Sequence, residues 1–432
     1  MTTHLEFSSR SAEITPVADL RPVVHRMTIC LVALTAVILG LVLADTVFLV
    51  HYRPLAADSS LSAHLAIPEV WPGTGGRGPW GDIEIQPIKI CPPVELLRAS
   101  APVVSGETVW YWCNTDRLKL SAQLATLDLS GEVRAELLGL AHDEASIAGL
   151  TMRPSREFLR KLKPKQRSEI YTALSNYPAN ADQGLAFRFL GPSLEKWLEG
   201  MAVPPRILWL LEPLIYRHGD YLFFADLRQI EGAFSSPEER LHVIRALSRE
   251  STYLVSLKVT PESDVAALVD YWGRGGRGKD VRPLIEALAN IQGGHKMSIA
   301  YLLPPFARDR LFTFPVPAES VADMKRDCHW TALNFFSKQP DDRFCNPAEV
   351  LRALTHDYYR VYSNPLLGDV VEFVDETGNA RHAAVYIADD FVFTKNGVSS
   401  SRPWMLMRLG ELKSYYPTRK PLQVLFYRPN NL

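Results

Sequence analysis

The chain has 432 residues, of which 47% are hydrophobic and 22% are charged. That composition is sufficient for a large packed core and excludes a disordered chain. Lysine and arginine number 47 against 48 aspartates and glutamates, so the formal net charge is −1. Without an excess of positive charge we expect no nucleic-acid partner, and the length predicts about three domains.

Residues 28–50 read TICLVALTAVILGLVLADTVFLV and carry one charge, at Asp45. A helix rises about 1.5 Å per residue, so a run of this length crosses a bilayer core of about 30 Å. The sequence therefore predicts a transmembrane helix at 28–50, in contact with the lipid bilayer, after a cytoplasmic tail at 1–27. A cleaved signal peptide and a buried core helix are the alternatives.

Basic residues flank this segment unequally. Arg10, Arg21 and Arg26 precede it, whereas Arg53 is the only basic residue between positions 51 and 70. Positive charges are preferentially retained on the cytoplasmic side of a membrane. We therefore expect a single-pass membrane protein with a cytoplasmic N-terminus and with the bulk of the chain extracytoplasmic.

The region after the apolar segment divides into a linker and a middle domain. Residues 51–88 are rich in glycine and proline and predict a linker. From 89 to 315 the apolar spacing is mostly helical, which predicts a mainly helical domain of unknown role. Cys91 and Cys113 could form a disulfide in an exported chain, although their spacing alone leaves this open.

One string in the middle domain has the glycine and lysine spacing of a phosphate-binding loop, from Gly273 to Lys279. Asp280 follows where such a loop needs serine or threonine, and an amphipathic helix precedes it where a strand is needed. We interpret the string as a basic turn between helices. Its arginines are expected on a solvated face, with an anionic polymer as the alternative partner; they include Arg274, Arg277 and Arg282.

Residues 316–432 have a different pattern. Helical spacing gives way to strand-like runs, and hairpin turns are indicated at Gly378-Asn379 and Asp389-Asp390. The predicted helices are 327–336, 347–361 and 406–415, and the predicted strands are 369–374, 382–388, 391–394 and 423–427. The fold class is therefore α+β, with an N-terminal transmembrane helix, a mainly helical middle domain and a C-terminal domain built on an antiparallel sheet.

Cys328 follows Asp327 at the start of a predicted helix. An aspartate cap would place the cysteine in the first turn, where unpaired backbone N–H groups and the helix dipole favour a thiolate and the oxyanion of a tetrahedral intermediate. His382 begins a predicted strand and would act as the base toward the sulfur. We expect no cofactor and no metal, because the spacing of nearby cysteines and histidines matches no common zinc-ligand pair.

Three elements resemble the NlpC-type peptidases of bacterial cell walls, a branch of the papain-like cysteine peptidase superfamily: Asp327-Cys328, Gly368 to Val371, and His382 to Ile387. The resemblance covers only 316–432. It implies a papain-like domain with Cys328 as the nucleophile, His382 as the base, and peptidoglycan peptides as the substrate class.

The sequence also departs from that family. His329 and Trp330 follow the cysteine, where serine or glycine is usual. The family's third residue, an orienting side chain one strand beyond the base, would fall near Thr394. We prefer Asn396 for that role, because its amide oxygen can accept a hydrogen bond from an imidazole N–H.

These observations predict a membrane-anchored extracytoplasmic cysteine hydrolase, a peptidase or amidase that acts on cell-wall peptides. The alternative is a membrane-anchored binding or scaffold protein that has the papain-like fold without catalysis, since the third residue does not match the family. The sequence does not determine the oligomeric state.

Overall fold

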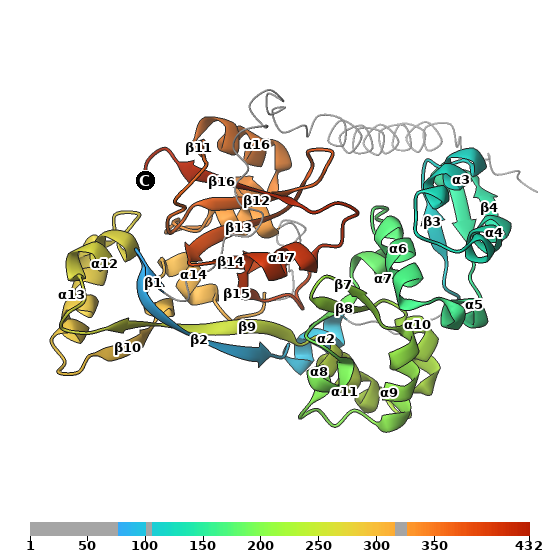
Figure 1. Cartoon of the computed structure of the whole chain (residues 1–432), viewed down its shortest axis with the longest axis horizontal. Coiled ribbons are helices and arrows are strands. Elements are labelled where there is room, and N and C mark those ends of the chain that lie inside the picture. Colours follow the sequence, from blue (N-terminus) through green and yellow to red (C-terminus); the bar gives the residue numbers. More distant parts are fainter. Residues whose placement is uncertain (1–76, 101–105, 316–325) are drawn as a thin grey trace, which may run out of the picture. The chain divides into compact units, whose positions relative to one another are not determined.

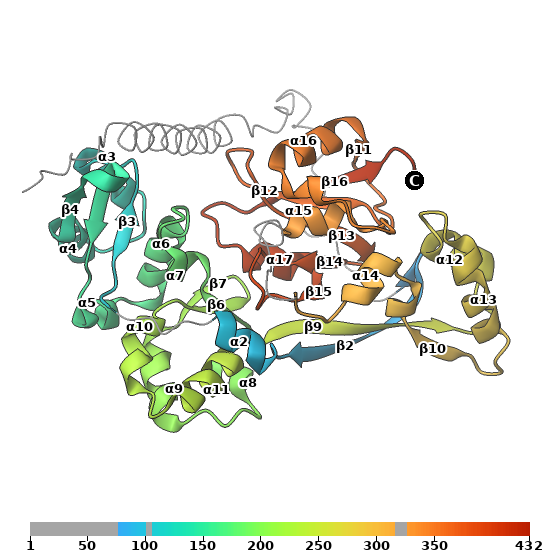
Figure 2. The same cartoon turned by 180° about the vertical axis from the view of Figure 1, so that it is seen from behind.

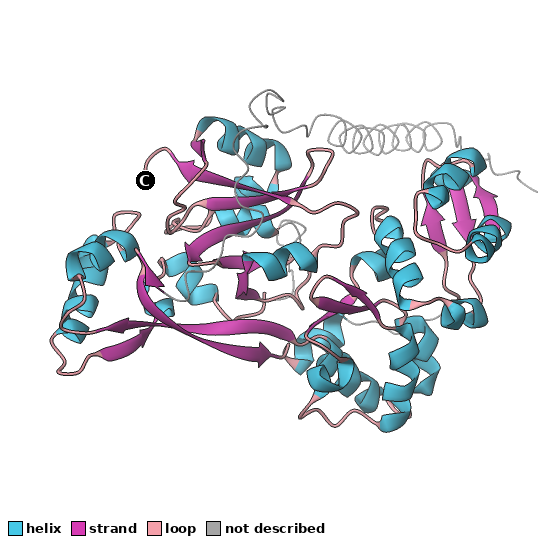
Figure 3. Cartoon of the chain, viewed as in Figure 1, coloured by secondary structure: helices cyan, strands magenta, loops and turns pink. Residues whose placement is uncertain are grey.

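A computed structural model of the chain describes residues 77–100, 106–315 and 326–432, all within one compact unit, Ala56–Leu432. In these ranges the strands form four sheets, with helices between them (Figures 1 and 3). The largest sheet has six strands, each antiparallel to its neighbours, in the order β11-β16-β12-β13-β14-β15. Its strands are β11 Tyr358–Val361, β12 Val370–Val374, β13 Ala380–Ala388, β14 Phe391–Lys395, β15 Trp404–Arg408 and β16 Gln423–Pro429.

The two hairpin turns expected in this sheet are confirmed. Gly378 lies between β12 and β13 with a φ of 86°, and Asp389 lies between β13 and β14 with a φ of 56°. Glycine adopts positive φ without a steric penalty, and aspartate tolerates it better than most residues. The antiparallel order of β12, β13 and β14 thus follows from local turn signals.

Helices surround this sheet: α15 Cys328–Leu333, α16 Pro347–His356 and α17 Leu409–Tyr415. Helix α15 packs against β13 and β14 (Figure 2). The rings of Phe335 and Phe393 are 5.9 Å apart, and Trp404 Nε1 donates a hydrogen bond to Thr331 Oγ1 at 3.1 Å. The helix predicted from residue 406 begins at Leu409 instead, because residues 404–408 pair with β14.

The middle region contains more strand than the sequence predicted. Strand β2 (Gly81–Ile90) pairs antiparallel with β9 (Glu250–Val259) along its whole length, and the two form a long ribbon (Figure 3). Its sheet has the order β1-β2-β9-β10, with β1 at Arg77–Gly78 and β10 at His295–Ser298. Two further sheets have the orders β3-β5-β4 and β6-β8-β7. Their strands are β3 Trp110–Trp112, β4 Ala141–Glu144, β5 Gly149–Met152, β6 Phe187–Leu190, β7 Tyr216–His218 and β8 Tyr221–Phe224.

The helices of the middle region are mostly short. They are α2 Val94–Ser100, α3 Arg117–Ala125, α4 Gly131–Leu140, α5 Arg156–Lys161, α6 Pro164–Leu174, α7 Ala181–Gly184, α8 Leu194–Leu198, α9 Pro205–Leu211, α10 Leu227–Ile230, α11 Pro237–Leu247, α12 Val265–Trp272, α13 Gly278–Ala289 and α14 Pro305–Arg310. Helices are therefore the commonest elements of the middle region, as the sequence predicted, and the strands are an addition to them.

Part of the predicted linker also belongs to strand β2. Pro87 obscured this strand in the sequence, because proline lacks the N–H that a central strand needs. The residue is tolerated because β1 pairs with β2 only at Gly81 and Asp82. At Pro87, β9 is therefore the only strand of the described residues that pairs with β2, and the opposite edge needs no backbone N–H donor.

The predicted fold class is corrected in one respect. No helix within 77–100, 106–315 and 326–432 is long and apolar enough to cross a membrane. The structure therefore does not support the transmembrane helix that was part of the predicted fold. Residues 28–50, on which that prediction falls, lie outside the ranges that the structure describes.

The glycine-rich string from 273 is a turn between α12 and α13, as expected. Gly275 has a φ of +74°, and a Cβ atom there would lie 2.5 Å from the ring of Phe336, so only glycine fits. Arg282 is exposed, as expected, but Arg274 and Arg277 do not belong to a solvated face. Arg274 Nε donates to Leu367 O at 3.0 Å and Arg277 Nη1 donates to Leu302 O at 2.7 Å, so both side chains hold neighbouring backbone.

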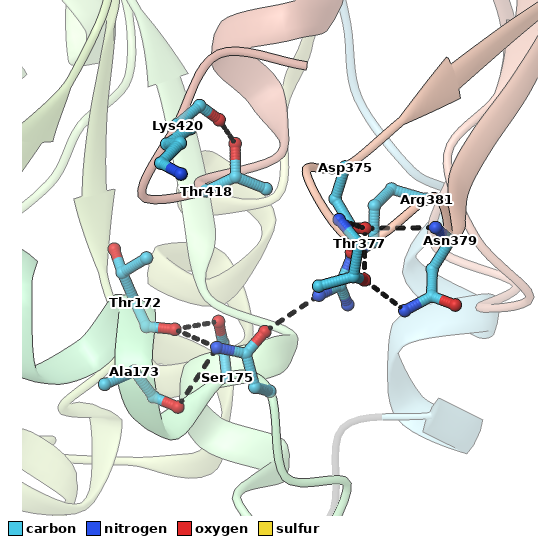
Figure 4. Close-up of polar contacts among 10 residues, drawn as sticks. Thr172, Ala173, Ser175, Asp375, Thr377, Asn379, Arg381, Thr418 and Lys420 are labelled. Carbon is cyan, nitrogen blue, oxygen red and sulfur yellow. Dashed lines mark hydrogen bonds and ion pairs between the residues drawn. The ribbon is translucent and has the colours of Figure 1, made fainter. Parts of the chain in front are cut away.

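The middle and C-terminal regions pack as one body. Buried Arg188 donates through Nε to Tyr415 O at 3.1 Å, and Arg402 forms an ion pair with Glu250 of β9. A third contact joins the start of β13 to the residues after α6, where Arg381 Nη2 donates to Asn176 Oδ1 at 3.1 Å (Figure 4). Cys91 and Cys113, the candidate disulfide partners, are both free.

Candidate active site

Cys328 lies in the first turn of α15, as the sequence predicted, but the backbone amides around it are occupied. Asp327 is the N-cap residue, and its Oδ1 accepts hydrogen bonds from the N–H groups of His329 at 2.9 Å and Trp330 at 3.0 Å. These are two of the first-turn amides that were expected to stabilise an anion, and the N–H of Cys328 itself is not among those that the cap engages. Because the cap carboxylate already accepts from these two amides, side chains beside the sulfur are needed to compensate a negative charge on Cys328 further.

The sulfur of Cys328 contacts the imidazole of the next residue. Sγ lies 3.6 Å from His329 Nδ1, and His329 Nε2 lies 3.3 Å from Glu372 Oε2 of β12. Both ends are sheltered, since Cys328 is 7% exposed and Glu372 is 3% exposed. The order thiol, imidazole, carboxylate is that of an activated nucleophile whose base is oriented by a third group.

The charge state of His329 follows from these neighbours. Burial by itself would lower the pKa of His329. The charges of Glu372 and Cys328 and a hydrogen bond with Asp327 outweigh it, so the pKa of His329 lies well above its ordinary value. These neighbours favour the protonated form of His329 beside the sulfur, and an adjacent cation favours the thiolate form of a cysteine.

The predicted base, His382, makes no hydrogen bond with the sulfur. It is fully buried, its Nε2 lies 2.6 Å from Thr394 Oγ1, and its Nδ1 has no hydrogen-bond partner. Thr394 Oγ1 in turn donates to Asn396 Oδ1 at 3.3 Å. The hydroxyl therefore accepts from His382 Nε2–H, and the predicted orienting residue Asn396 reaches the imidazole only through Thr394.

Strand alternation explains why the two histidines are separated. Glu372 pairs with Ala383, and Phe373 pairs with His382, whose ring lies 5.9 Å from that of Phe373. Consecutive residues of a strand point to opposite faces of the sheet. His329 thus meets β12 on the Glu372 face, whereas His382 packs on the Phe373 face. The signal for His329 in the sequence was the departure from the family pattern directly after the cysteine.

A group of side chains at this site could also hold a metal ion. The ligand atoms of Asp327, Cys328 and His329 all lie within 4.8 Å of one another, and Asp327 Oδ2 is 3.9 Å from His329 Nδ1. The Asp327 carboxylate already caps the helix, and the imidazole already bridges the sulfur and Glu372. We therefore interpret the group as a thiol–imidazole pair.

We expect buried His382 to make the protein less stable in acid. The pKa of His382 is lowered to about 3, chiefly by burial and then by the charge of His329. The charge of Lys395 also lowers this pKa, whereas the charge of Asp327 raises it. Between about pH 3 and 6.5 the unfolded chain binds a proton that the folded chain does not. The free energy of unfolding should therefore fall as the pH falls, by up to about 1.4 kcal/mol per pH unit.

The measurement is denaturant unfolding at several pH values from 4.5 to 6.5, for the wild type and for His382→Gln. The variant should lose this part of the slope, whereas His356→Gln, at an exposed position, should keep it. Burial also raises the pKa of Asp226 to about 6, which acts in the opposite direction but equally in all three proteins. An unchanged slope in His382→Gln would show that this imidazole is protonated in the folded state.

Comparisons with known proteins identify no relative from which a function could be assigned. No family model, curated protein or solved structure matches the chain. The likeness to NlpC-type peptidases accordingly rests on the quoted motifs alone, and the functional argument rests on Cys328, His329 and Glu372.

Proposed function

We propose that this protein is a cysteine-dependent hydrolase of amide bonds, with Cys328 as the nucleophile and His329 as its acid–base partner. The supporting observation is the line of contacts from Cys328 Sγ to His329 Nδ1 at 3.6 Å and from His329 Nε2 to Glu372 Oε2 at 3.3 Å. Glu372 would hold the imidazole in orientation and stabilise its protonated form. His382 has no part in this proposal.

The proposed reaction proceeds in two steps. The Cys328 thiolate attacks the amide carbonyl carbon and forms a C–S bond, and the C–N bond breaks as His329 gives its proton to the leaving amine. Water then attacks the thioester and transfers a proton to His329 as the C–S bond breaks. The products are an amine and a carboxylic acid, and the thiolate–imidazolium pair is restored.

The substrate class is proposed from the resemblance to NlpC-type peptidases. That resemblance favours peptide stems or cross-bridges of peptidoglycan. The site itself requires only a carbonyl group with an amine leaving group. A panel that includes both muropeptides and simple peptide amides therefore separates the chemistry from the specificity.

The test compares Cys328→Ala with Cys345→Ala, the other cysteine variant of the C-terminal region. Each protein is incubated with the panel, and released amines are identified by mass spectrometry. We expect Cys328→Ala to lose all turnover and Cys345→Ala to retain it, because Cys345 lies at the end of a separate short helix, Asp342–Cys345. Equal turnover by Cys328→Ala and the wild type would refute the proposal.

A non-catalytic binding module is the second candidate. It is favoured by the low exposure of Cys328, 7%, since a substrate carbonyl must reach the sulfur. A wild-type protein that neither cleaves any member of the panel nor forms an adduct at Cys328 with a peptide-based electrophile would support this reading.

A further inference from the structure

Lys395, the last residue of β14, is a buried cation that the proposed chemistry has not used. It is 1% exposed, and its Nζ donates to the carbonyl oxygens of Gly397 and, at 3.3 Å, Ser399. Within residues 77–100, 106–315 and 326–432 no carboxylate lies at ion-pair distance from it. Removing an ammonium from water is energetically costly, and two carbonyl dipoles offset only part of that cost.

The position of Lys395 relates it to α15. It pairs with Trp404 of β15, and its Nζ lies 5.8 Å from the centre of the Trp404 ring. Trp404 Nε1 donates to Thr331 Oγ1 at 3.1 Å. Because Thr331 lies three residues after Cys328, the two share one face of the helix. Lys395 therefore belongs to the sheet face against which the Cys328 turn packs.

Electrostatics point to the same pair of anions. Burial is the main influence on Lys395 and lowers its pKa to about 8, and the charge of Arg402 acts in the same direction. The charges of Cys328 and Asp327 act the other way and raise it. Cys328 and Asp327 are thus the negative groups that act on Lys395. The Asp327 carboxylate already accepts hydrogen bonds from two backbone amides.

We propose that Lys395 is a positioning residue that stabilises the anionic form of Cys328. The cap of α15 leaves the amides of His329 and Trp330 unable to do so. In this proposal the His329 imidazolium and the Lys395 ammonium together balance a negative charge on the sulfur. The catalytic consequence of this inference rests on the proposed hydrolase function, but the effect on the thiol does not.

The experiment measures the rate at which iodoacetamide alkylates Cys328 from pH 5 to 10, with the modified peptide quantified by mass spectrometry. Lys395→Met and Lys395→Gln remove the charge, and the glutamine amide can still donate to the Gly397 and Ser399 carbonyls. Lys395→Arg keeps the charge. Lys338→Met is the matched control, because Lys338 is an exposed lysine shortly after α15.

We expect both neutral variants to alkylate about tenfold more slowly at pH 7, with the profile displaced to higher pH, since one unit of thiol ionisation is a factor of ten. Lys395→Arg should recover most of the rate, and Lys338→Met should match the wild type. A wild-type profile in the neutral variants, or equal losses in the arginine and neutral variants, would overturn the inference. If Lys395→Met does not fold, Lys395→Gln gives the same test.

The outcomes separate this inference from the proposed function. A Lys395-dependent alkylation profile without amide turnover would retain the charge balance and remove the hydrolase. Turnover that requires Cys328 but shows no Lys395 dependence in the alkylation profile would retain the hydrolase and remove the role of Lys395.

Discussion

Replacing His329 with asparagine is expected to lower kcat/KM for amide hydrolysis about 10²- to 10⁴-fold at pH 7, the range that a positioned acid–base group contributes. The imidazole that contacts Cys328 Sγ is lost, and so is its contact with Glu372. Both the thiolate and the proton donor for the leaving amine depend on that ring. The alkylation rate of Cys328 should fall in the same variant, because alkylation reports the thiolate without any substrate.

His382→Asn is the matched comparison, since it makes the same replacement in the same region at an imidazole that contacts Thr394 instead of the sulfur. Its effect on kcat/KM should be much smaller than that of His329→Asn, once both proteins are shown by circular dichroism to be folded. A larger loss in His382→Asn would reverse the assignment. The base would then be the histidine that the family resemblance implied.

The largest expected effect on stability comes from Arg428→Met. Asp369 is fully buried, and its carboxylate accepts from Arg428 Nε at 2.8 Å and Nη2 at 2.7 Å. Removing the guanidinium leaves a buried carboxylate without its counter-ion. We expect the free energy of unfolding to fall by about 3 kcal/mol, the lower end for breaking a buried pair, because the Arg428 side chain is itself 15% exposed.

Urea unfolding at pH 7 measures this loss. Arg352→Met is the control, because its partner Glu349 lies on the same exposed surface of α16, and such pairs contribute little. Adding Asp369→Asn to Arg428→Met should recover part of the loss, since an amide carries no charge that needs a partner. A midpoint for Arg428→Met that equals that of Arg352→Met would show that Asp369 is not left as an unpaired anion.

The elements of the C-terminal region were predictable where one local signal decided them. The aspartate before Cys328 marks the start of α15, and the glycine and aspartate of the two turns mark the ends of β12 and β13. The predicted helix at 406–415 failed in part. Residues 404–408 have no local signal that overrides a helical pattern, and pairing with β14 made them a strand.

The ribbon of β2 and β9 shows what a local pattern cannot supply. The two strands begin at Gly81 and Glu250, so neither has its partner nearby in the chain. A glycine- and proline-rich segment has weak intrinsic preference for a strand. It becomes one because the partner provides the hydrogen bonds that the segment alone lacks.

By itself the sequence determined that Cys328 begins a helix capped by Asp327, and that His382 lies near the start of a strand of an antiparallel sheet, because caps and turns act within a few residues. Only the tertiary structure decided which imidazole meets the sulfur. Alternation along β12 places Glu372 and Phe373 on opposite faces. The Glu372 side chain therefore engages His329, whereas His382 forms its hydrogen bond with Thr394.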